Sequence, residues 1–477
     1  MTGRIGEVVG SARAVVALTR SGVVRPVRPD RLVGMAVGLA RYGLSVTAGY
    51  ALGAARHPGR TALVDDTGSV TFAQLDRHTD AVARALAASG VGPGTRVGVL
   101  ARNGRAVVEA QVAAGKLGAD VVLLNTGLPA AQLAQVAAEL ELHTVVADGE
   151  QRCALPAGTR VLTALDDLDG PGPLPLRPPS GHTIVLTSGT SGPPKGARRP
   201  PVHSLAPAAA ILSAIPVRAG APVMVAAPLL HTWGYAALQI AVLHGAPVVL
   251  RHRFDPAGFL RTVEEQRVDA VFAVPVMLQR VLELPAAELD AAWRTHRPRI
   301  VAVSGSALPG GLATAFMDRF GDVLHNVYGS TEVSWVSIAS PADLRAAPGT
   351  AGRAPAGTRL VVLGPDDRPV RRGTEGRVFV RNDMPFAGYT REGADVPRAG
   401  GLLGTGDVGR VDRRGLLHLT GRADDMIVSG GENVHPGPVE DLLAARPEVR
   451  EAAVTGVPDD EFGQRLAAYV VLAPGAR

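Results

Sequence analysis

Short apolar runs alternate with longer alanine-rich segments in the first part of the chain. Val97–Leu100, Val121–Leu124 and Thr144–Ala147 are short and mostly apolar, as strands buried on both faces of a sheet are. Ala106–Leu117 and Pro129–Leu142 lie between them and are long enough for helices. This alternation predicts crossover units on a parallel sheet.

The same alternation runs from Thr183 to Val327, and the pattern then changes twice. After about residue 357, strand-like runs joined by turns predict a β-rich part; they are Arg359–Leu363, Gly376–Val380 and Leu416–Leu419. Beyond Gly421 a third pattern begins, with Pro438–Ala445 helical and Ala467–Leu472 strand-like.

These patterns predict an α/β fold with a large N-terminal domain and a small one. The large domain, 56–420, is expected to hold two parallel-sheet α/β subdomains and the β-rich part at about 357–420. A basic, partly apolar extension, 1–55, precedes it, and a partial α+β domain, 421–477, follows it.

The longest uncharged stretch, Ala219–Leu250, lacks Asp, Glu, Lys and Arg but is broken by prolines, glycines and histidines. A membrane-spanning helix needs about 20 continuous apolar residues. We therefore predict a strand at Val223–Ala227, a helix at Tyr235–Leu243 and a strand at Pro247–Leu250, within the core.

Composition supports a folded chain with a large core. Hydrophobic residues make up 46% of the 477 residues and charged residues 19%, which excludes a disordered chain. A single cysteine, Cys153, excludes a disulfide framework and a cysteine-based zinc site, and favours a cytoplasmic location. The net charge of +5 and the 4% aromatic content give poor support for nucleic-acid binding.

The charge is concentrated at the N-terminus. Residues 1–60 contain nine arginines and two acidic residues, Glu7 and Asp30, a balance of +7. Apolar runs at Val33–Ala40 and Leu44–Leu52 accompany them. One interpretation is a solvated leader followed by a helix that packs on the body. The other is a basic amphipathic helix that makes peripheral contact with an anionic membrane. Arginines interrupt every apolar run, so a cleaved signal peptide is not expected.

A loop of small and hydroxylated residues follows a predicted strand at Thr183–Leu186, in the stretch HTIVLTSGTSGPPKGA. Glycines let backbone N–H groups approach an anion, and Lys195 supplies a mobile positive charge for phosphate. The chain has only two lysines, Lys116 and Lys195, among 49 basic residues. Because the sequence uses arginine at nearly every other basic position, a lysine in this loop indicates that the bulkier arginine guanidinium cannot replace it here. The spacing is not that of a Walker loop.

This loop resembles the phosphate loop of the adenylate-forming superfamily, which comprises acyl-CoA synthetases, luciferases and peptide-synthetase adenylation domains. Of its members, the chain is most similar to fatty acyl-CoA ligases. The resemblance covers roughly residues 55–475 and implies that Lys195 is catalytic. It implies that the loop contacts phosphate through Thr187, Ser188, Gly189, Thr190, Ser191 and Gly192.

Further motifs follow in the family's order. The segment Tyr328-Gly329-Ser330-Thr331-Glu332 implies that Tyr328 stacks on adenine, Thr331 contacts the α-phosphate and Glu332 holds Mg²⁺. Gly305, Ser306 and Ala307 belong to a stretch that resembles the adenine-side loop.

Two residues are expected at the nucleotide sugar. Gly404–Gly409 fits G-x-G-x-x-G, but a hairpin-like pattern at Arg410–Leu419 follows it and no helix does, so a dinucleotide fingerprint is rejected. The resemblance implies instead that Asp407 accepts hydrogen bonds from the ribose hydroxyls and that Arg422 reaches ribose or phosphate.

The family pattern also implies a mobile C-terminal part. Asp424 is the expected hinge between the two conformations used in turn. Gly430, Gly431 and Glu432 are expected in the loop that meets the CoA thiol. The segment that resembles the wall of the acyl pocket contains His231, Trp233 and Gly234. The alternative for His231 is a structural role, as a core histidine whose ring nitrogens are hydrogen-bonded. No Gly-x-Ser-x-Gly elbow occurs, which disfavours a serine hydrolase.

One family feature has no counterpart. Members end in a loop whose lysine contacts the acyl carboxylate and α-phosphate, but no lysine follows Lys195 in this sequence. Either the protein continues beyond Arg477, or the enzyme diverges and uses another cation or another acceptor.

The expected function is ATP- and Mg²⁺-dependent activation of an apolar fatty or aryl acid and its transfer to CoA. Two alternatives remain. One is an adenylate-forming biosynthetic enzyme whose acceptor is a carrier-protein thiol, an amine or another nitrogen. The other is a nucleotide binder that has lost catalysis. The identity of the acid and the oligomeric state are left open by the sequence.

Overall fold

A computed structural model describes residues 16–23, 26–148, 155–163, 165, 167–187, 195–199, 201–384, 386–390, 396–429, 432–444, 446, 448–459 and 463–473. The chain divides into two compact units. Unit 1 is made of residues 1–305 and 383–395, and unit 2 of residues 306–382 and 396–477. The predicted boundaries at 55 and 420 remain predictions.

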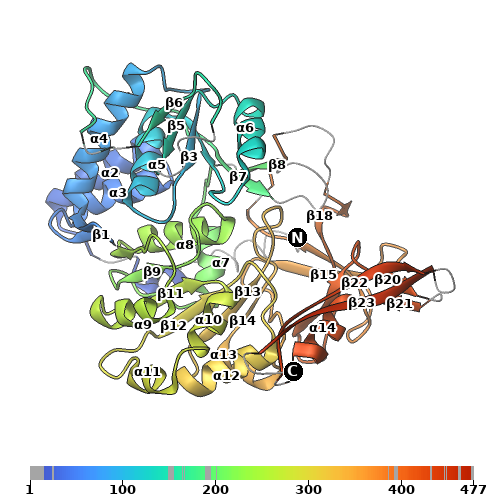
Figure 1. Cartoon of the computed structure of the whole chain (residues 1–477). Coiled ribbons are helices and arrows are strands. Elements are labelled where there is room, and N and C mark those ends of the chain that lie inside the picture. The colour runs from blue at the N-terminus through green and yellow to red at the C-terminus, as the bar shows by residue number, and fades with distance from the viewer. Residues whose placement is uncertain are drawn as a thin grey trace, which may run out of the picture. The chain divides into compact units, whose positions relative to one another are not determined.

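Unit 1 contains two mainly parallel sheets. The first has the strand order β6-β5-β3-β4-β7-β8, and all but the β7–β8 pair are parallel. Its strands are β3 (Arg96–Leu100), β4 (Asp120–Leu123), β5 (Thr144–Ala147), β6 (Arg160–Leu162), β7 (Thr183–Thr187) and β8 (Lys195–Arg199). Helices α5 (Arg105–Leu117) and α6 (Ala130–Glu139) lie on opposite sides of it (Figure 1).

In the second sheet of unit 1, the strand order is β12-β11-β9-β10-β1-β2, and only β2 is antiparallel to its neighbour. Its strands are β1 (Thr61–Asp65), β2 (Gly68–Thr71), β9 (Val223–Val225), β10 (Val248–Val249), β11 (Ala270–Ala273) and β12 (Ile300–Val303). All residues of β9 to β12 are buried, as expected for strands covered on both faces.

The remaining helices of unit 1 pack around these sheets. They are α2 (Pro29–Tyr42), α3 (Val46–Arg56), α4 (Phe72–Ala88), α7 (Ala206–Leu212), α8 (Thr232–Leu243), α9 (Pro256–Glu265), α10 (Pro275–Leu282) and α11 (Ala286–Ala291). Local sequence starts several of them: Thr71 and Gln74 form a capping box at α4, and Asp255 caps α9 ahead of Pro256.

Unit 2 carries a five-stranded antiparallel sheet in the order β15-β16-β18-β17, with β19 also paired to β18. These strands are β15 (Arg359–Leu363), β16 (Gly376–Arg381), β17 (Arg398–Ala399), β18 (Leu402–Val411) and β19 (Leu417–Arg422). They confirm the β-rich part expected after residue 357, and the β18–β19 hairpin confirms the rejection of a dinucleotide fingerprint.

Three antiparallel pairs and three helices complete the described part of unit 2. The strands are β13 (Leu324–Tyr328) with β14 (Ser337–Ala339), β20 (Ile427–Ser429) with β21 (Glu432–Val434), and β22 (Val449–Asp459) with β23 (Gly463–Leu472). The helices are α12 (Gly310–Phe320), α13 (Pro341–Ala346) and α14 (Pro436–Ala444).

Element ends differ from the sequence predictions in a few places. The helix expected to reach Leu142 ends at Glu139, because Glu141 has a φ of 51° and leaves the right-handed helical region. The strand expected at Pro247–Leu250 is confined to Val248–Val249. The uncharged stretch is confirmed as core, with α8 only 12 residues long. Among the described residues, no helix combines the length and hydropathy needed to cross a bilayer.

Candidate functional site

The predicted phosphate loop joins two neighbouring antiparallel strands. β7 ends at Thr187, and β8 begins at Lys195, which lies opposite it in register. Ser188, Gly189, Thr190, Ser191 and Gly192 lie outside the described residues, and so does Cys153. The sheet therefore fixes both ends of the loop and sets Lys195 at its exit.

Lys195 has an aromatic neighbour that the sequence did not reveal. Its ammonium Nζ lies 5.8 Å from the centre of the Tyr389 ring, a cation–π distance. The segment that carries Tyr389 runs beside β8: Thr390 N donates to Gly196 O at 2.7 Å, and Arg198 N donates to Gly388 O at 3.0 Å. A lone tyrosine some 190 residues downstream gave no local signal of this contact.

In unit 2, residues 79 positions apart meet at one carboxylate. The Tyr328 hydroxyl, at the end of β13, donates a short hydrogen bond to Asp407 Oδ2 on β18. Asp407 N donates to Thr405 Oγ1 at 3.0 Å, which fixes the strand beneath it. Burial raises the pKa of Asp407, and burial followed by the Asp407 charge raises the pKa of Tyr328 well above its ordinary value. The tyrosine therefore keeps its proton and remains the donor of this bond.

Arg422 lies opposite Asp407 in the β18–β19 register. A Cβ at Gly406 would lie only 3.1 Å from Arg422 Nη2, so a glycine, here with a φ of 82°, gives this guanidinium its space. Arg422 Nε also donates to Asp424 Oδ1 at 2.9 Å, and this bond raises the pKa of Arg422. Asp407 and Arg422, the two residues predicted to contact the ribose, thus lie close to Asp424, the predicted hinge residue.

The loop after β13 is a tight connection to β14. A Cβ at Gly329 would lie 1.9 Å from Ser334 O, so only glycine fits there. Ser330 Oγ donates to Glu332 Oε2 at 2.8 Å, and Thr331 and Glu332 are half-buried. A carboxylate held by a hydroxyl fits a Mg²⁺ that binds mainly through substrate phosphates. Among the described residues, no cluster of three or more metal-ligating side chains occurs.

Asn382 supports this loop and was missed by sequence reasoning. Its Nδ2 donates to Val333 O at 2.7 Å and to Trp335 O at 2.8 Å. The indole of Trp335 donates to Thr358 Oγ1 at 2.8 Å. These bonds fix the chain that leads away from Glu332.

The predicted acyl-pocket segment lies at the carboxyl edge of the second sheet in unit 1, where ligands bind in many α/β folds. His231 is the N-cap residue of α8 and is exposed. Trp233 is buried, donates to Ala273 O at 2.9 Å and lies 5.4 Å from the Phe272 ring. A Cβ at Gly234 would lie 2.2 Å from Pro228 O, so this turn requires glycine.

Gly305 lies on the same edge, two residues after the end of β12, with a φ of 95°. It lies close to Val274, because a Cβ at Gly305 would be 3.6 Å from Val274 Cγ1. Ser306 and Ala307 are exposed and belong to unit 2. Gly430 and Gly431 lie outside the described residues, and Glu432 is the first residue of β21.

A buried asparagine anchors the pocket segment from another sheet. Asn103, after β3, donates through Nδ2 to Val225 O at 3.1 Å and to Ala227 O at 3.0 Å. Its Oδ1 accepts from Leu229 N at 2.8 Å. These three bonds hold the end of β9 and the loop that follows it in place. No sequence motif pointed to Asn103.

Replacing Asn103 by alanine is therefore expected to lower the free energy of unfolding by about 2 kcal/mol, since three buried backbone groups lose their partner. Asn125→Ala is the matched control, because the side chain of Asn125 bonds to the nearby Gly127 N in an exposed turn. Urea unfolding followed by circular dichroism measures both. Equal losses in the two variants would contradict the anchoring role.

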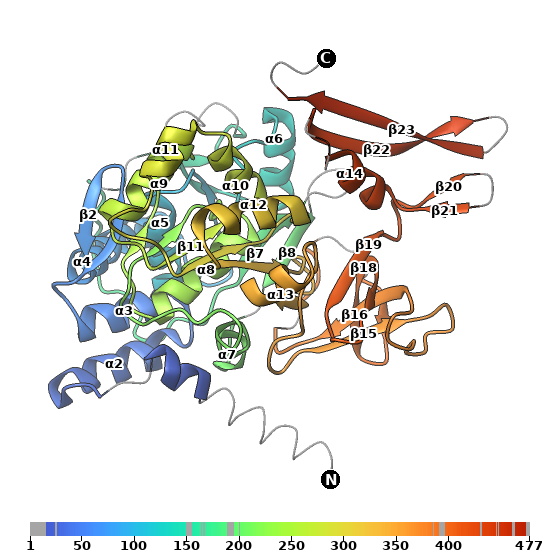
Figure 2. The ribbon, with the colours of Figure 1, turned by 90° about the horizontal axis from the view of Figure 1, so that it is seen from below.

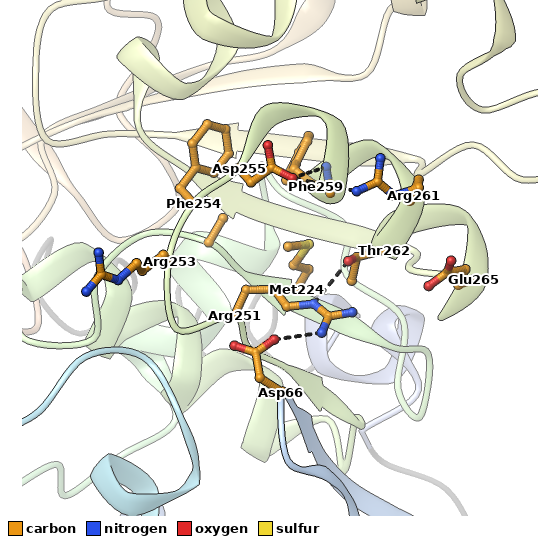
Figure 3. A pocket seen from close by; sticks show the side chains of 12 residues that line it. Asp66, Met224, Arg251, Arg253, Phe254, Asp255, Phe259, Arg261, Thr262 and Glu265 are labelled. Atoms are coloured by element: carbon orange, nitrogen blue, oxygen red, sulfur yellow. Dashed lines mark hydrogen bonds and ion pairs between the residues drawn. The ribbon is translucent and has the colours of Figure 1, made fainter. Parts of the chain in front are cut away.

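A separate cavity of about 290 Å³ lies in unit 1 between α9 and the ends of β9 and β10 (Figure 3). Arg251 Nη1 lies 2.7 Å from Asp66 Oδ1, and Arg251 Nε donates to Thr262 Oγ1 at 3.1 Å. Arg261 Nη2 lies 3.7 Å from Asp255 Oδ2. Carboxylates thus balance these two guanidinium groups, and the residues that line the cavity include none of the predicted site residues.

Comparison with known proteins identifies the family of this chain. Residues 51–390 match the AMP-binding enzyme family, and residues 438–477 match the AMP-binding enzyme C-terminal domain. The chain belongs to the AMP-binding enzyme family, which confirms the resemblance to the adenylate-forming superfamily and the α/β fold class.

Its relatives include CoA ligases. The chain is 34% identical over 436 residues to a feruloyl-CoA synthase of Amycolatopsis sp, covering 88% of this chain and 87% of the relative. It is 31% identical over 427 residues to a 2-succinylbenzoate–CoA ligase of Geobacillus kaustophilus, covering 88% and 86%.

Two solved structures extend the comparison. The o-succinylbenzoate CoA synthetase of Bacillus subtilis, in complex with its acyl-adenylate intermediate, has a TM-score of 0.78 at 26% identity and covers 89% of this chain and 88% of its own. The amide bond synthetase McbA of Marinactinospora thermotolerans has a TM-score of 0.79 at 27% identity and covers 93% and 90%.

Proposed function

We propose that this protein activates an apolar aryl or fatty acid with ATP and transfers the acyl group to CoA. The observation that carries the proposal is the half-buried Asp407 carboxylate, held by the Tyr328 hydroxyl and faced by Arg422, in a member of the AMP-binding enzyme family. The named activities of the feruloyl-CoA and 2-succinylbenzoate–CoA relatives favour an acid with an aromatic ring.

The chemistry proceeds in two balanced steps. A carboxylate oxygen of the acid attacks the α-phosphorus of ATP, the bond to the pyrophosphate oxygen breaks, and pyrophosphate leaves. The CoA thiol then gives its proton to water and attacks the acyl carbon, the bond between the acyl carbon and the AMP oxygen breaks, and AMP leaves. The first step makes the acid electrophilic, because AMP is a good leaving group whereas an oxide ion is not.

In this proposal, residues of the chain position the nucleotide and offset the charge of its phosphates. Asp407 accepts from the ribose hydroxyls, while Tyr328 holds its other oxygen and presents an aromatic ring to adenine. Lys195 and the loop before it bind phosphate oxygens, and a Mg²⁺ held by Glu332 offsets phosphate charge when bound. The ATP and magnesium complex of the B. subtilis synthetase, with a TM-score of 0.77 at 27% identity, supports these cofactors.

An acid panel tests the proposal. The chain is incubated with ATP, Mg²⁺, CoA and single aryl or fatty acids, and pyrophosphate and CoA thioester are measured. We expect both products, in equal amounts, with at least one aryl acid. Pyrophosphate release with no acid preference, or no pyrophosphate with any acid, would overturn it; ATP binding without pyrophosphate would support the nucleotide-binder alternative.

An amine acceptor is the second candidate. It is favoured by the likeness to the amide bond synthetase. The same panel with an amine in place of CoA separates the two functions. Pyrophosphate with an amide product, and no thioester when CoA is offered, would establish the second function and exclude the first.

A further inference from the structure

Helix α2 lies on the outside of unit 1 and packs on α3 (Figure 2). Two glycines, one turn apart, bring the helices close: Cβ atoms built at Gly34 and Gly38 would lie 3.1 Å from Ala55 Cβ and 3.5 Å from Ala51 Cβ. Tyr42 is buried on the same side. One half of α2 is thereby committed to the body, and α3 continues the packing onto α4, α5 and α8.

The other half of α2 faces solvent and is apolar. Val33, Val37, Leu32 and Leu39 are 69%, 58%, 49% and 44% exposed. Ala36 and Ala40 are also exposed. At 3.6 residues per turn these six positions form one continuous face. A helix that merely rests on a folded body carries polar residues there, so this face indicates a partner.

Positive charge accompanies the apolar face at both ends. Arg28, with 71% of its side chain exposed, stands just before the helix and pairs with the exposed Asp30 at 3.1 Å, and Arg41 lies in the last turn and donates to Pro175 O at 2.8 Å. Residues 1–60 carry +7, from nine arginines and two acids, whereas the other residues carry 40 basic and 42 acidic groups, or −2. The basic and apolar features thus coincide at one place on the chain.

We propose that the exposed face of α2, defined by Leu32, Val33, Ala36, Val37, Leu39 and Ala40, docks on an anionic lipid bilayer. The helix would lie in the plane of the interface, with its valines among the acyl chains and its arginines at the phosphates. Its 14 residues are too few to span the hydrocarbon. The inference does not depend on the proposed function.

Charge favours a membrane over a second copy of this chain. Two α2 faces paired about a two-fold axis would place Arg28 of each copy near Arg41 of the other if the helices ran antiparallel, and like residues beside each other if they ran parallel. Like charges would then meet at both ends of a short apolar contact. Anionic headgroups neutralise the same arginines instead, so the bilayer is the occupant that satisfies both features.

Vesicle co-sedimentation of the full chain tests the proposal. We expect binding to vesicles of phosphatidylcholine mixed with phosphatidylglycerol, weak binding to phosphatidylcholine alone, and release at high salt. The double variant Val33→Glu with Val37→Glu should bind the mixed vesicles at least about tenfold more weakly. The pair Arg28→Gln with Arg41→Gln should lower binding to mixed vesicles only.

Leu442→Glu is the matched control, since Leu442 is 69% exposed on α14 and should not change vesicle binding. Circular dichroism and the thermal midpoint verify that each variant folds. The proposal is overturned if the folded wild-type chain ignores anionic vesicles, or if it binds neutral and anionic vesicles equally. Sedimentation velocity showing a dimer that the glutamate variant dissociates would assign the face to a second copy instead.

Discussion

Replacing Asp407 by alanine is expected to lower kcat/KM for adenylate formation at least about 100-fold. A charged acceptor contributes about 1.5–3 kcal/mol per hydrogen bond, and the ribose of ATP offers two hydroxyls to this carboxylate. The variant also leaves the hydroxyl of the half-buried Tyr328 without its acceptor and Arg422 without the facing charge. Pyrophosphate exchange and equilibrium binding of ATP measure the loss.

Two variants separate the carboxylate from the fold around it. Tyr328→Phe keeps the ring and removes one hydrogen bond, so a loss of about tenfold is expected. Asp412→Asn, in the turn of the same hairpin, where Asp412 accepts from Leu416 N at 2.8 Å, should leave kcat/KM nearly unchanged. ATP affinity that survives in Asp407→Ala would refute the assigned role.

The raised pKa of Asp407 adds a pH signature to the same prediction. Burial is the main cause of the rise, and the carboxylate is the form that accepts both ribose hydroxyls. As the pH falls, Asp407 therefore becomes protonated earlier than an ordinary aspartate does. ATP affinity of the wild-type chain should weaken on the acid side at a higher pH than an unperturbed carboxylate would give, and the alanine variant should lack this step.

Replacing Lys116 by alanine is expected to lower the free energy of unfolding by about 2–4 kcal/mol. The side chain of Lys116 is 0% exposed, and its ammonium lies 2.8 Å from Asp76 Oδ1 and 2.5 Å from Asp80 Oδ1. It also donates to Asp76 O at 2.8 Å. The variant loses these bonds, leaves two neighbouring carboxylates on α4 to repel each other, and opens a cavity beside α5.

Arginine should not rescue this position. A guanidinium is bulkier than an ammonium, and overfilling a fully buried site costs about 1–3 kcal/mol. Arg261→Ala removes one partner of an exposed pair and is the matched control, with an expected change under about 0.5 kcal/mol. Urea unfolding measures all three variants. A Lys116→Arg chain as stable as the wild type would contradict the steric argument.

Lys116 also bears on the argument made for Lys195. The sequence has lysine at only two positions, and the structure explains the lysine at position 116 by the lack of space for a larger guanidinium. Lys195 occupies a different setting, half-buried over a tyrosine ring. The steric reason found for Lys116 therefore does not apply to Lys195, whose catalytic role is a separate prediction.

Local pattern determined much of this protein by itself. The run Thr144–Ala147 and the run Arg359–Leu363 predict their strands to the residue, because a strand of this kind is encoded by four or five neighbouring side chains. The phosphate-loop sequence from Thr187 to Gly196 identified the superfamily for the same reason, and the Tyr328–Glu332 and Gly404–Gly409 motifs supported it, since each is a short stretch of neighbouring residues.

Tertiary structure alone decided which distant groups meet. Tyr328 and Asp407 share a hydrogen bond across 79 residues, Asn103 anchors Leu229 across 126, and Tyr389 reaches Lys195 across 194. No local period encodes such pairs, because they depend on how sheets and crossovers bring strand ends together. For a related reason, the sequence did not determine which side of α2 is exposed. The middle of this helix is apolar all round, and only its packing on α3 shows which half remains uncovered.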